Sequence, residues 1–124
     1  MILDNVNPDD LFPTEKKGPS VLGMIEYNVQ GQTKFEGAFI ATNERLIMNV
    51  DMNGQFYYRN IRYDEINQIH CDGSDIIFEF NIGTVPMREI KTEDVQAFVD
   101  YIKQYELIPI KQICYIKILK NTMT

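Results

Sequence analysis

With 124 residues and a mass of 14.5 kDa, the chain fits a single domain that is long enough to bury a hydrophobic core without metals or disulfides. Its 18 acidic and 12 basic residues give a net charge of −6, which repels phosphate backbones, so we expect no nucleic-acid partner. No stretch approaches the ~20 consecutive apolar residues that a membrane span needs.

The chain divides into three sections. Residues 1–19 contain Pro8 and Pro13 and predict an irregular lead-in to a domain at residues 20–106. The start of the lead-in carries acidic residues where a secretory signal needs basic ones, so we expect a cytoplasmic protein. Residues 107–124 form a tail of different composition.

A β-hairpin organises the start of the domain. Two apolar runs, residues 35–41 and 46–50, flank a polar break at residues 42–45, and a β-forming run at residues 20–29 precedes them. The Thr42 hydroxyl and the Asn43 amide can each bond backbone groups within the turn. Because short connections join them, the first three strands predict an antiparallel meander.

Four more strands follow, separated by turn signals. Asn53-Gly54 is the strongest short hairpin signal in the chain, and a second turn lies at residues 72–75. Pro86 predicts a sheet edge or a strand start, because proline cannot donate to a strand ladder. The predicted strands cover residues 56–61, 66–71, 76–82 and 85–90.

One amphipathic helix completes the domain. Thr92 is the predicted N-cap, and Glu93 and Asp94 suit the positive end of the helix dipole. The buried stripe is predicted at i, i+3, i+4 and i+7, which are Val95, Phe98, Val99 and Ile102.

Four motifs occur in register over about residues 20–105. They are Gly23-Met-Ile-Glu-Tyr, Gly37-Ala-Phe-Ile-Ala-Thr-Asn-Glu-Arg-Leu-Ile-Met, Ile61-Arg-Tyr-Asp-Glu-Ile-Asn-Gln-Ile and Ile90-Lys-Thr-Glu-Asp-Val-Gln-Ala-Phe. With this order of elements, the chain resembles the bacterial pleckstrin-homology-like (PH-like) domains, relatives of the PH and GRAM domains. The resemblance implies a mainly β fold. It is a partly open barrel of seven antiparallel strands, in near-orthogonal sheets of four and three, closed at one mouth by the C-terminal helix.

The first hairpin loop does not fit phosphoinositide binding. PH domains that bind these lipids carry several basic residues there, whereas residues 28–34 contain only Lys34. One base near an anionic surface contributes about 1 kcal/mol, which is too little to anchor so acidic a chain. Arg59 and Arg62 add a basic spot elsewhere that is more typical of a solvated face. We therefore do not expect membrane binding through this loop.

No pattern in the sequence is typical of a catalytic, cofactor or metal site. His70 and Cys71 are neighbours in a predicted strand, so their side chains point to opposite faces, and we interpret them as a buried or half-buried pair. Asp72 and Asp75 fit local bonding in a turn. We predict a protein without enzyme activity, metal or cofactor.

The tail is apolar and basic. It contains three lysines and no acid, and because the whole chain carries −6, residues 1–106 carry −9. Residues 115–118 alternate enough to suggest a strand, but Ile110, Ile113 and Ile116 also fit a helical stripe, so both element types stay open. Because the segment combines high β-propensity with apolar length, it must be covered. It either folds back on its own domain or adds to the sheet edge of a neighbouring chain, and we favour the second, a homo-oligomer. The predicted interface residues are Ile110, Ile113, Tyr115, Ile116 and Ile118.

The predicted function is that of a non-catalytic interaction module, which binds an unidentified protein or itself through an exposed strand edge or the barrel rim. Tyr57 and Tyr58 could anchor such contacts, but we favour half-buried rings with exposed hydroxyls. The alternative function is a membrane- or lipid-associated module. It would use Lys111, Lys117 and Lys120 of the tail instead of the first loop.

Overall fold

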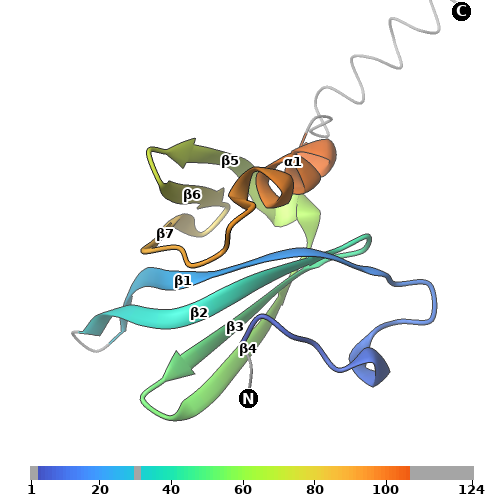
Figure 1. Cartoon of the computed structure of the whole chain (residues 1–124), viewed down its shortest axis with the longest axis horizontal. Coiled ribbons are helices and arrows are strands. Elements are labelled where there is room, and N and C mark those ends of the chain that lie inside the picture. The colour runs from blue at the N-terminus through green and yellow to red at the C-terminus, as the bar shows by residue number, and fades with distance from the viewer. Residues whose placement is uncertain (1–2, 30–31, 107–124) are drawn as a thin grey trace, which may run out of the picture.

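A computed structural model describes residues 3–29 and 32–106 (Figure 1). Within them the fold is mainly β, as predicted, with seven antiparallel strands and a C-terminal helix. The strands are β1 (Lys17–Val29), β2 (Gln32–Thr42), β3 (Leu46–Met52), β4 (Gln55–Ile61), β5 (Ile66–Asp72), β6 (Asp75–Phe80) and β7 (Gly83–Arg88). Two short 3-10 helices, η1 (Pro8–Asp10) and η2 (Tyr63–Glu65), accompany the α-helix α1 (Val95–Glu106).

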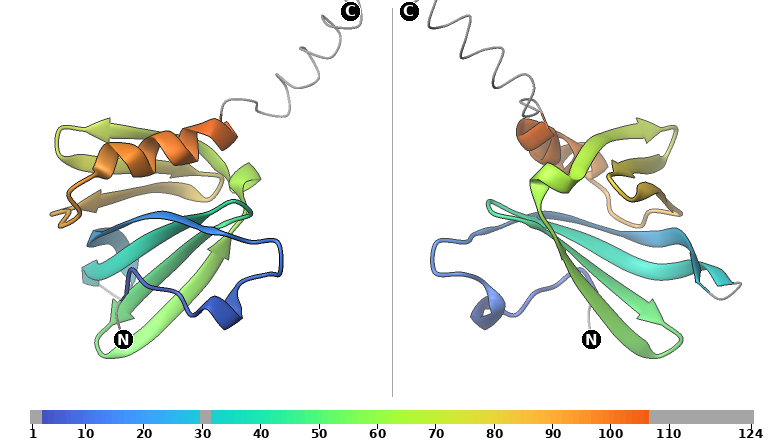
Figure 2. Two further views of the ribbon diagram at one scale, coloured as in Figure 1. Left: turned by 45° about the vertical axis from the view of Figure 1, so that its right-hand side comes forward. Right: turned by 180° about the vertical axis from the view of Figure 1, so that it is seen from behind.

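The strands form one bent sheet in the order β4-β3-β2-β1-β7-β6-β5. Strands β1–β4 make one half and β5–β7 the other, and the two halves enclose the core as a partly open barrel (Figure 2). They join where β1 pairs with β7, through Met24–Arg88 and Ile25–Met87. The outermost strands, β4 and β5, diverge from η2, which connects them.

Strand β1 can serve both halves because Gly23 leaves room for the chain that follows β7. A Cβ atom at Gly23 would lie 2.8 Å from the Arg88 carbonyl oxygen and 3.2 Å from the Ile90 Cα. Beyond β7, the Lys91 N–H donates to the Leu22 carbonyl oxygen over 2.8 Å. This close approach fixes the bend between the two halves of the sheet.

The ends of the later strands differ from the prediction. Strand β6 ends at Phe80, and Ile82, expected inside the strand, lies in the following turn with 64% of its surface exposed. Pro86 lies inside β7, so the predicted strand start is wrong, but the predicted edge holds locally, because Pro86 pairs with Ile77 of β6 and has no partner in β1. The β1–β7 ladder includes only Met87 and Arg88, so a missing N–H at Pro86 breaks no bond to β1.

The predicted turn between β2 and β3 forms, and it also holds the N-terminal section. The Thr42 Oγ1 accepts from the Arg45 N–H over 3.0 Å, as predicted. Asn43 does not bond within the turn. Its Oδ1 accepts from the Lys16 N–H over 2.6 Å, and its Nδ2 donates to the Thr14 carbonyl oxygen over 3.0 Å. The predicted role of Asn43 is therefore wrong, because its amide ties residues 14–16 to the turn.

Helix α1 begins later than predicted, because Asp94 caps it instead of Thr92. The Asp94 Oδ1 accepts from the Ala97 N–H over 3.0 Å. The Thr92 Oγ1 accepts from the Leu22 N–H over 2.8 Å, so it ties the loop before the helix to β1.

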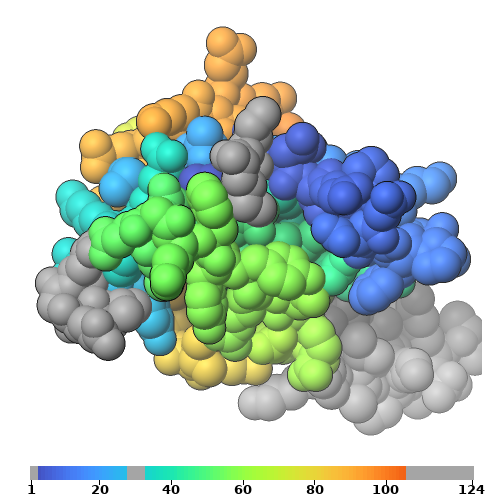
Figure 3. Space-filling view, turned by 90° about the horizontal axis from the view of Figure 1, so that it is seen from below, coloured from blue at the N-terminus to red at the C-terminus, as the bar shows by residue number. Residues whose placement is uncertain are grey.

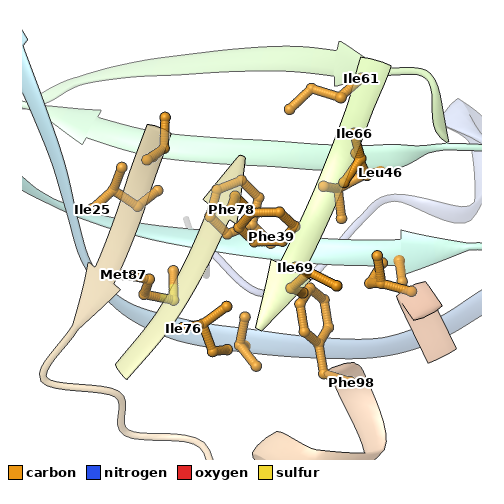
Figure 4. Packing of buried hydrophobic residues seen from close by; sticks show 14 of the residues in the cluster. Ile25, Phe39, Leu46, Ile61, Ile66, Ile69, Ile76, Phe78, Met87 and Phe98 are labelled. Carbon is orange, nitrogen blue, oxygen red and sulfur yellow. The ribbon is translucent and has the colours of Figure 1, made fainter. Parts of the chain in front are cut away.

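The predicted helical stripe is confirmed. Phe98, Val99 and Ile102 are at most 1% exposed, and the half-buried Val95 packs against the same core. The Phe98 ring meets the Phe78 ring edge-on, with centroids 6.2 Å apart (Figure 4). Helix α1 therefore closes one mouth of the barrel.

The N-terminal residues lie against the outer face of β3 and β4 (Figure 3). Leu3 is buried, and its carbonyl oxygen accepts from the Asn49 Nδ2 over 2.8 Å. Glu15 is also buried and pairs with Arg45, while the Phe12 ring lies 4.4 Å from the Arg45 guanidinium carbon. These contacts fasten residues 3–16 to the sheet.

Candidate functional site

A pocket of about 300 Å³ lies at the mouth of the barrel that α1 does not close. Its lining comes from β1–β4, from η2 and from the region around the β6–β7 turn, and most of it is apolar. Six buried residues form its inner part: Ile25, Phe35, Val50, Ile61, Phe80 and Val85.

The rim of the pocket exposes large apolar side chains. Tyr27, Tyr57 and Ile82 line the pocket and are 51%, 56% and 64% exposed. Large exposed apolar groups gathered at one concave place are typical of a binding site rather than of an ordinary surface. We call this rim, together with the open backbone edge of strand β4, the β4 surface.

Strand β4 combines this rim with the open edge of the sheet. Tyr57, Arg59 and Ile61 line the pocket, whereas Phe56 and Tyr58 point to the outer face, because successive side chains of a strand alternate. In the part of the chain that the structure describes, β4 pairs only with β3. Its other side therefore presents backbone groups to which a further strand can add.

The polar side chains of the pocket balance in charge. Arg59 Nη2 lies 3.8 Å from Glu65 Oε1, and both residues line the pocket. Lys34, in the first hairpin, lies 4.0 Å from Glu89. Exposed pairs of this kind contribute little to stability, but the charges of Arg59 and Glu65 cancel, so the described residues that line the pocket carry no net charge.

At the other end of β4, stacked tyrosines tie η2 to the last turn of α1. The Tyr63 and Tyr105 ring centroids are 4.0 Å apart, with 3° between the planes. The Tyr63 hydroxyl donates to the Thr42 carbonyl oxygen over 2.5 Å. The Tyr105 hydroxyl donates to the Asn43 carbonyl oxygen over 3.4 Å. Burial raises the pKa of Tyr63 well above its ordinary value, and it raises the pKa of Tyr101 beside it to about 12. The Tyr63 and Tyr101 hydroxyls therefore remain protonated at neutral pH.

The residues considered for chemistry in the sequence serve other roles. His70 is half-buried, as expected, with its Nδ1 3.7 Å from Glu79 Oε2, but Cys71 is exposed, so that part of the interpretation is wrong. Asp75 accepts from Arg88 Nη1 over 2.6 Å and holds β6 to β7. Across residues 3–29 and 32–106, no three metal-binding side chains gather closely enough to hold an ion.

The sequence interpretation missed the pocket and misjudged β4. Tyr57 and Tyr58 were expected to be half-buried, yet each is more than half exposed. A signal was present, because three successive rings, Phe56-Tyr57-Tyr58, cannot all face one side of a strand. The predicted tail interface lies outside the described residues. It comprises Ile110, Ile113, Tyr115, Ile116 and Ile118.

Comparisons with known proteins bear on the fold and the family. No curated protein matches the sequence. A solved structure, the C-terminal domain of an unknown protein from Leishmania infantum, is similar in fold, with a TM-score of 0.53 and 20% sequence identity. The similarity covers 73% of this chain and 84% of that one. Among the described residues, no helix is long and apolar enough to cross a membrane.

The family model of the bacterial PH domain matches residues 16–104, from the residue before β1 to near the end of α1. This match agrees with the bent seven-stranded sheet and with the helix that closes one mouth of the barrel. The chain belongs to the bacterial PH domain family.

Proposed function

We propose that this PH domain is a non-catalytic interaction module that binds an extended apolar segment of a protein at the β4 surface. The observation that carries the proposal is the position of Tyr57. Its ring lines the pocket and is 56% exposed, and it belongs to the outermost strand of the sheet. One short peptide can therefore use the pocket and the strand edge together.

The two parts of the surface supply different components of binding. Strand addition along β4 provides backbone hydrogen bonds that do not depend on sequence. The pocket selects for an apolar side chain, because every second residue of an added strand points to the same face. Exposed tyrosines add large contact area at a small cost in side-chain entropy.

Charge favours a protein segment over an anionic lipid. Six basic side chains of the described residues lie within 4.0 Å of a carboxylate, so few remain to gather phosphate groups. These pairs are Lys34–Glu89, Arg45–Glu15, Arg59–Glu65, Arg62–Asp64, Arg88 with Glu26 and Asp75, and Lys91–Glu36.

Peptide display against the immobilised full chain tests the proposal. We expect selected peptides to be extended and to carry an apolar residue. Their affinity should fall at least tenfold, about 1.4 kcal/mol, with Tyr57→Arg. Phe56→Arg is the matched control, since Phe56 is 49% exposed on the opposite face of the same strand. Equal losses in both variants, or no selected peptide, would overturn the proposal.

Anionic vesicles separate this function from the lipid alternative. In flotation with phosphatidylserine vesicles we expect the full chain to stay unbound. Binding that disappears when Lys111, Lys117 and Lys120 are changed to glutamine would assign the interaction to the tail and a membrane, against our proposal.

A further inference from the structure

We infer that residues 107–120 of the same chain occupy the β4 surface, pairing with β4 as an additional antiparallel strand and covering the pocket until a partner displaces them. This inference rests on the proposed function, since it names the internal competitor for the same surface.

The first support is the place where the tail begins. Helix α1 ends at Glu106, one residue after Tyr105, whose ring stacks on Tyr63 of η2. Strand β4 ends at Ile61, just before η2, so helix α1 ends near the end of β4 (Figure 2). A segment that starts there and follows β4 runs opposite to it. That is the antiparallel direction, the same as every other strand pair in the sheet.

The second support is length. Strand β4 has seven residues, which span about 23 Å. Fourteen residues, 107–120, reach about 45 Å when extended, so the tail has enough chain for a connection and a full-length strand. Pro109 lies in the connection, where its fixed φ favours a turn over continued helix.

The third support is composition and charge. The segment is rich in isoleucine and leucine, which suits a pocket whose lining is mostly apolar. Its lysines, Lys111, Lys117 and Lys120, carry +3, and residues 1–106 carry −9, so docking brings opposite charges together.

Tethering favours docking of the tail on its own chain over docking on a second copy. A short linker gives a tethered segment an effective concentration in the millimolar range. A second copy at micromolar concentration therefore competes poorly for the same surface. We therefore expect a monomer, whereas the sequence alone favoured a homo-oligomer.

Hydrogen exchange in the full chain tests the inference. The double variant Ile113→Asp/Ile116→Asp removes two apolar contacts, and we expect the amides of β4 to exchange at least tenfold faster than in the unmodified chain. The amides of β6, an inner strand, should not change. The control Thr122→Asp/Thr124→Asp changes the net charge by the same amount outside the docking segment, and β4 should remain protected. Unchanged exchange of β4 in the first variant would overturn the inference.

Two further measurements complete the test. Light scattering should show a monomer for the full chain, and a dimer that dissociates in the Ile113→Asp/Ile116→Asp variant would assign the tail to a second copy instead. Peptides selected on the full chain should bind this variant at least tenfold more tightly. Equal affinity for both chains would overturn the tail inference while leaving the proposed function intact; failure of every peptide on both chains would count against the proposed function.

Discussion

The Arg45 guanidinium donates to both oxygens of the Glu15 carboxylate, from Nε to Oε2 over 2.8 Å and from Nη2 to Oε1 over 3.0 Å. The two side chains are 8% and 0% exposed. Arg45 also donates to Asn60 Oδ1 and to the Asp10 carbonyl oxygen, and the Thr42 hydroxyl donates to Glu15 Oε2 over 2.5 Å. This pair joins the N-terminal section to the turn between β2 and β3.

Replacing Glu15 should destabilise the protein strongly. Glu15→Gln leaves the Arg45 charge buried without its counter-charge, and breaking a buried pair in this way costs about 3–5 kcal/mol. Urea denaturation at pH 7 measures the free energy of unfolding. The control is Glu36→Gln, because Glu36 pairs with Lys91 over 3.1 Å at the surface, with side chains 45% and 61% exposed. For Glu36→Gln we expect the free energy of unfolding to fall by less than about 1 kcal/mol. Similar losses in both variants would contradict the prediction.

The contribution of this pair should depend on pH. Burial raises the pKa of the Glu15 carboxyl, but the hydrogen bonds from Arg45 and Thr42 outweigh it and hold the pKa below the ordinary value of 4.5. A carboxylate with a lowered folded-state pKa contributes stability that is complete above the unfolded-state pKa and is lost as pH falls through the folded-state value. The stability gap between the unmodified chain and Glu15→Gln should therefore be constant from neutral pH down to about pH 5 and shrink in more acid solution. Unfolding curves at several pH values measure it, and a gap that widened toward acid pH would show that the sign is wrong.

Local signals predicted most of the fold. Asn53 and Gly54 have positive φ values of 57° and 90°, as the hairpin signal at this tip requires. The helical stripe containing Phe98 was equally visible, because its period of 3.6 is a local property. The buried Glu15 was not predicted, since its partner Arg45 lies 30 residues away and no local pattern links them.

The candidate site was much harder to predict than the fold. The pocket forms only when Tyr27 of β1, Tyr57 of β4 and Ile82 after β6 meet at one mouth of the barrel. None of these residues is unusual in its own segment. The predicted strand at residues 76–82 includes Ile82, but the strand ends at Phe80 and the turn after it exposes Ile82.

The correction of the helix start gives a further prediction. Asp94→Ala removes the side chain that accepts from the Ala97 N–H, so we expect a loss of about 1 kcal/mol in the free energy of unfolding. Glu93→Ala changes an adjacent exposed acidic residue and should cost less than about 0.5 kcal/mol. Chemical denaturation followed by circular dichroism compares the two variants. A larger loss for Glu93→Ala would mean that Asp94 is not the cap.

Phe98 provides the sharpest test of how α1 closes the barrel. Its side chain is 0% exposed and packs edge-on against Phe78, so Phe98→Ala should lower the free energy of unfolding by about 3–5 kcal/mol. Gln96→Ala, on the exposed side of the same helix, should change it by less than about 0.5 kcal/mol. A loss below about 1 kcal/mol for Phe98→Ala would mean that the helix does not close the barrel through this face.

The pocket lies at the opposite mouth and no residue of α1 lines it. The folded fraction of Phe98→Ala should therefore bind peptides at the β4 surface with unchanged affinity, whereas Tyr57→Arg should lose that affinity and keep its stability.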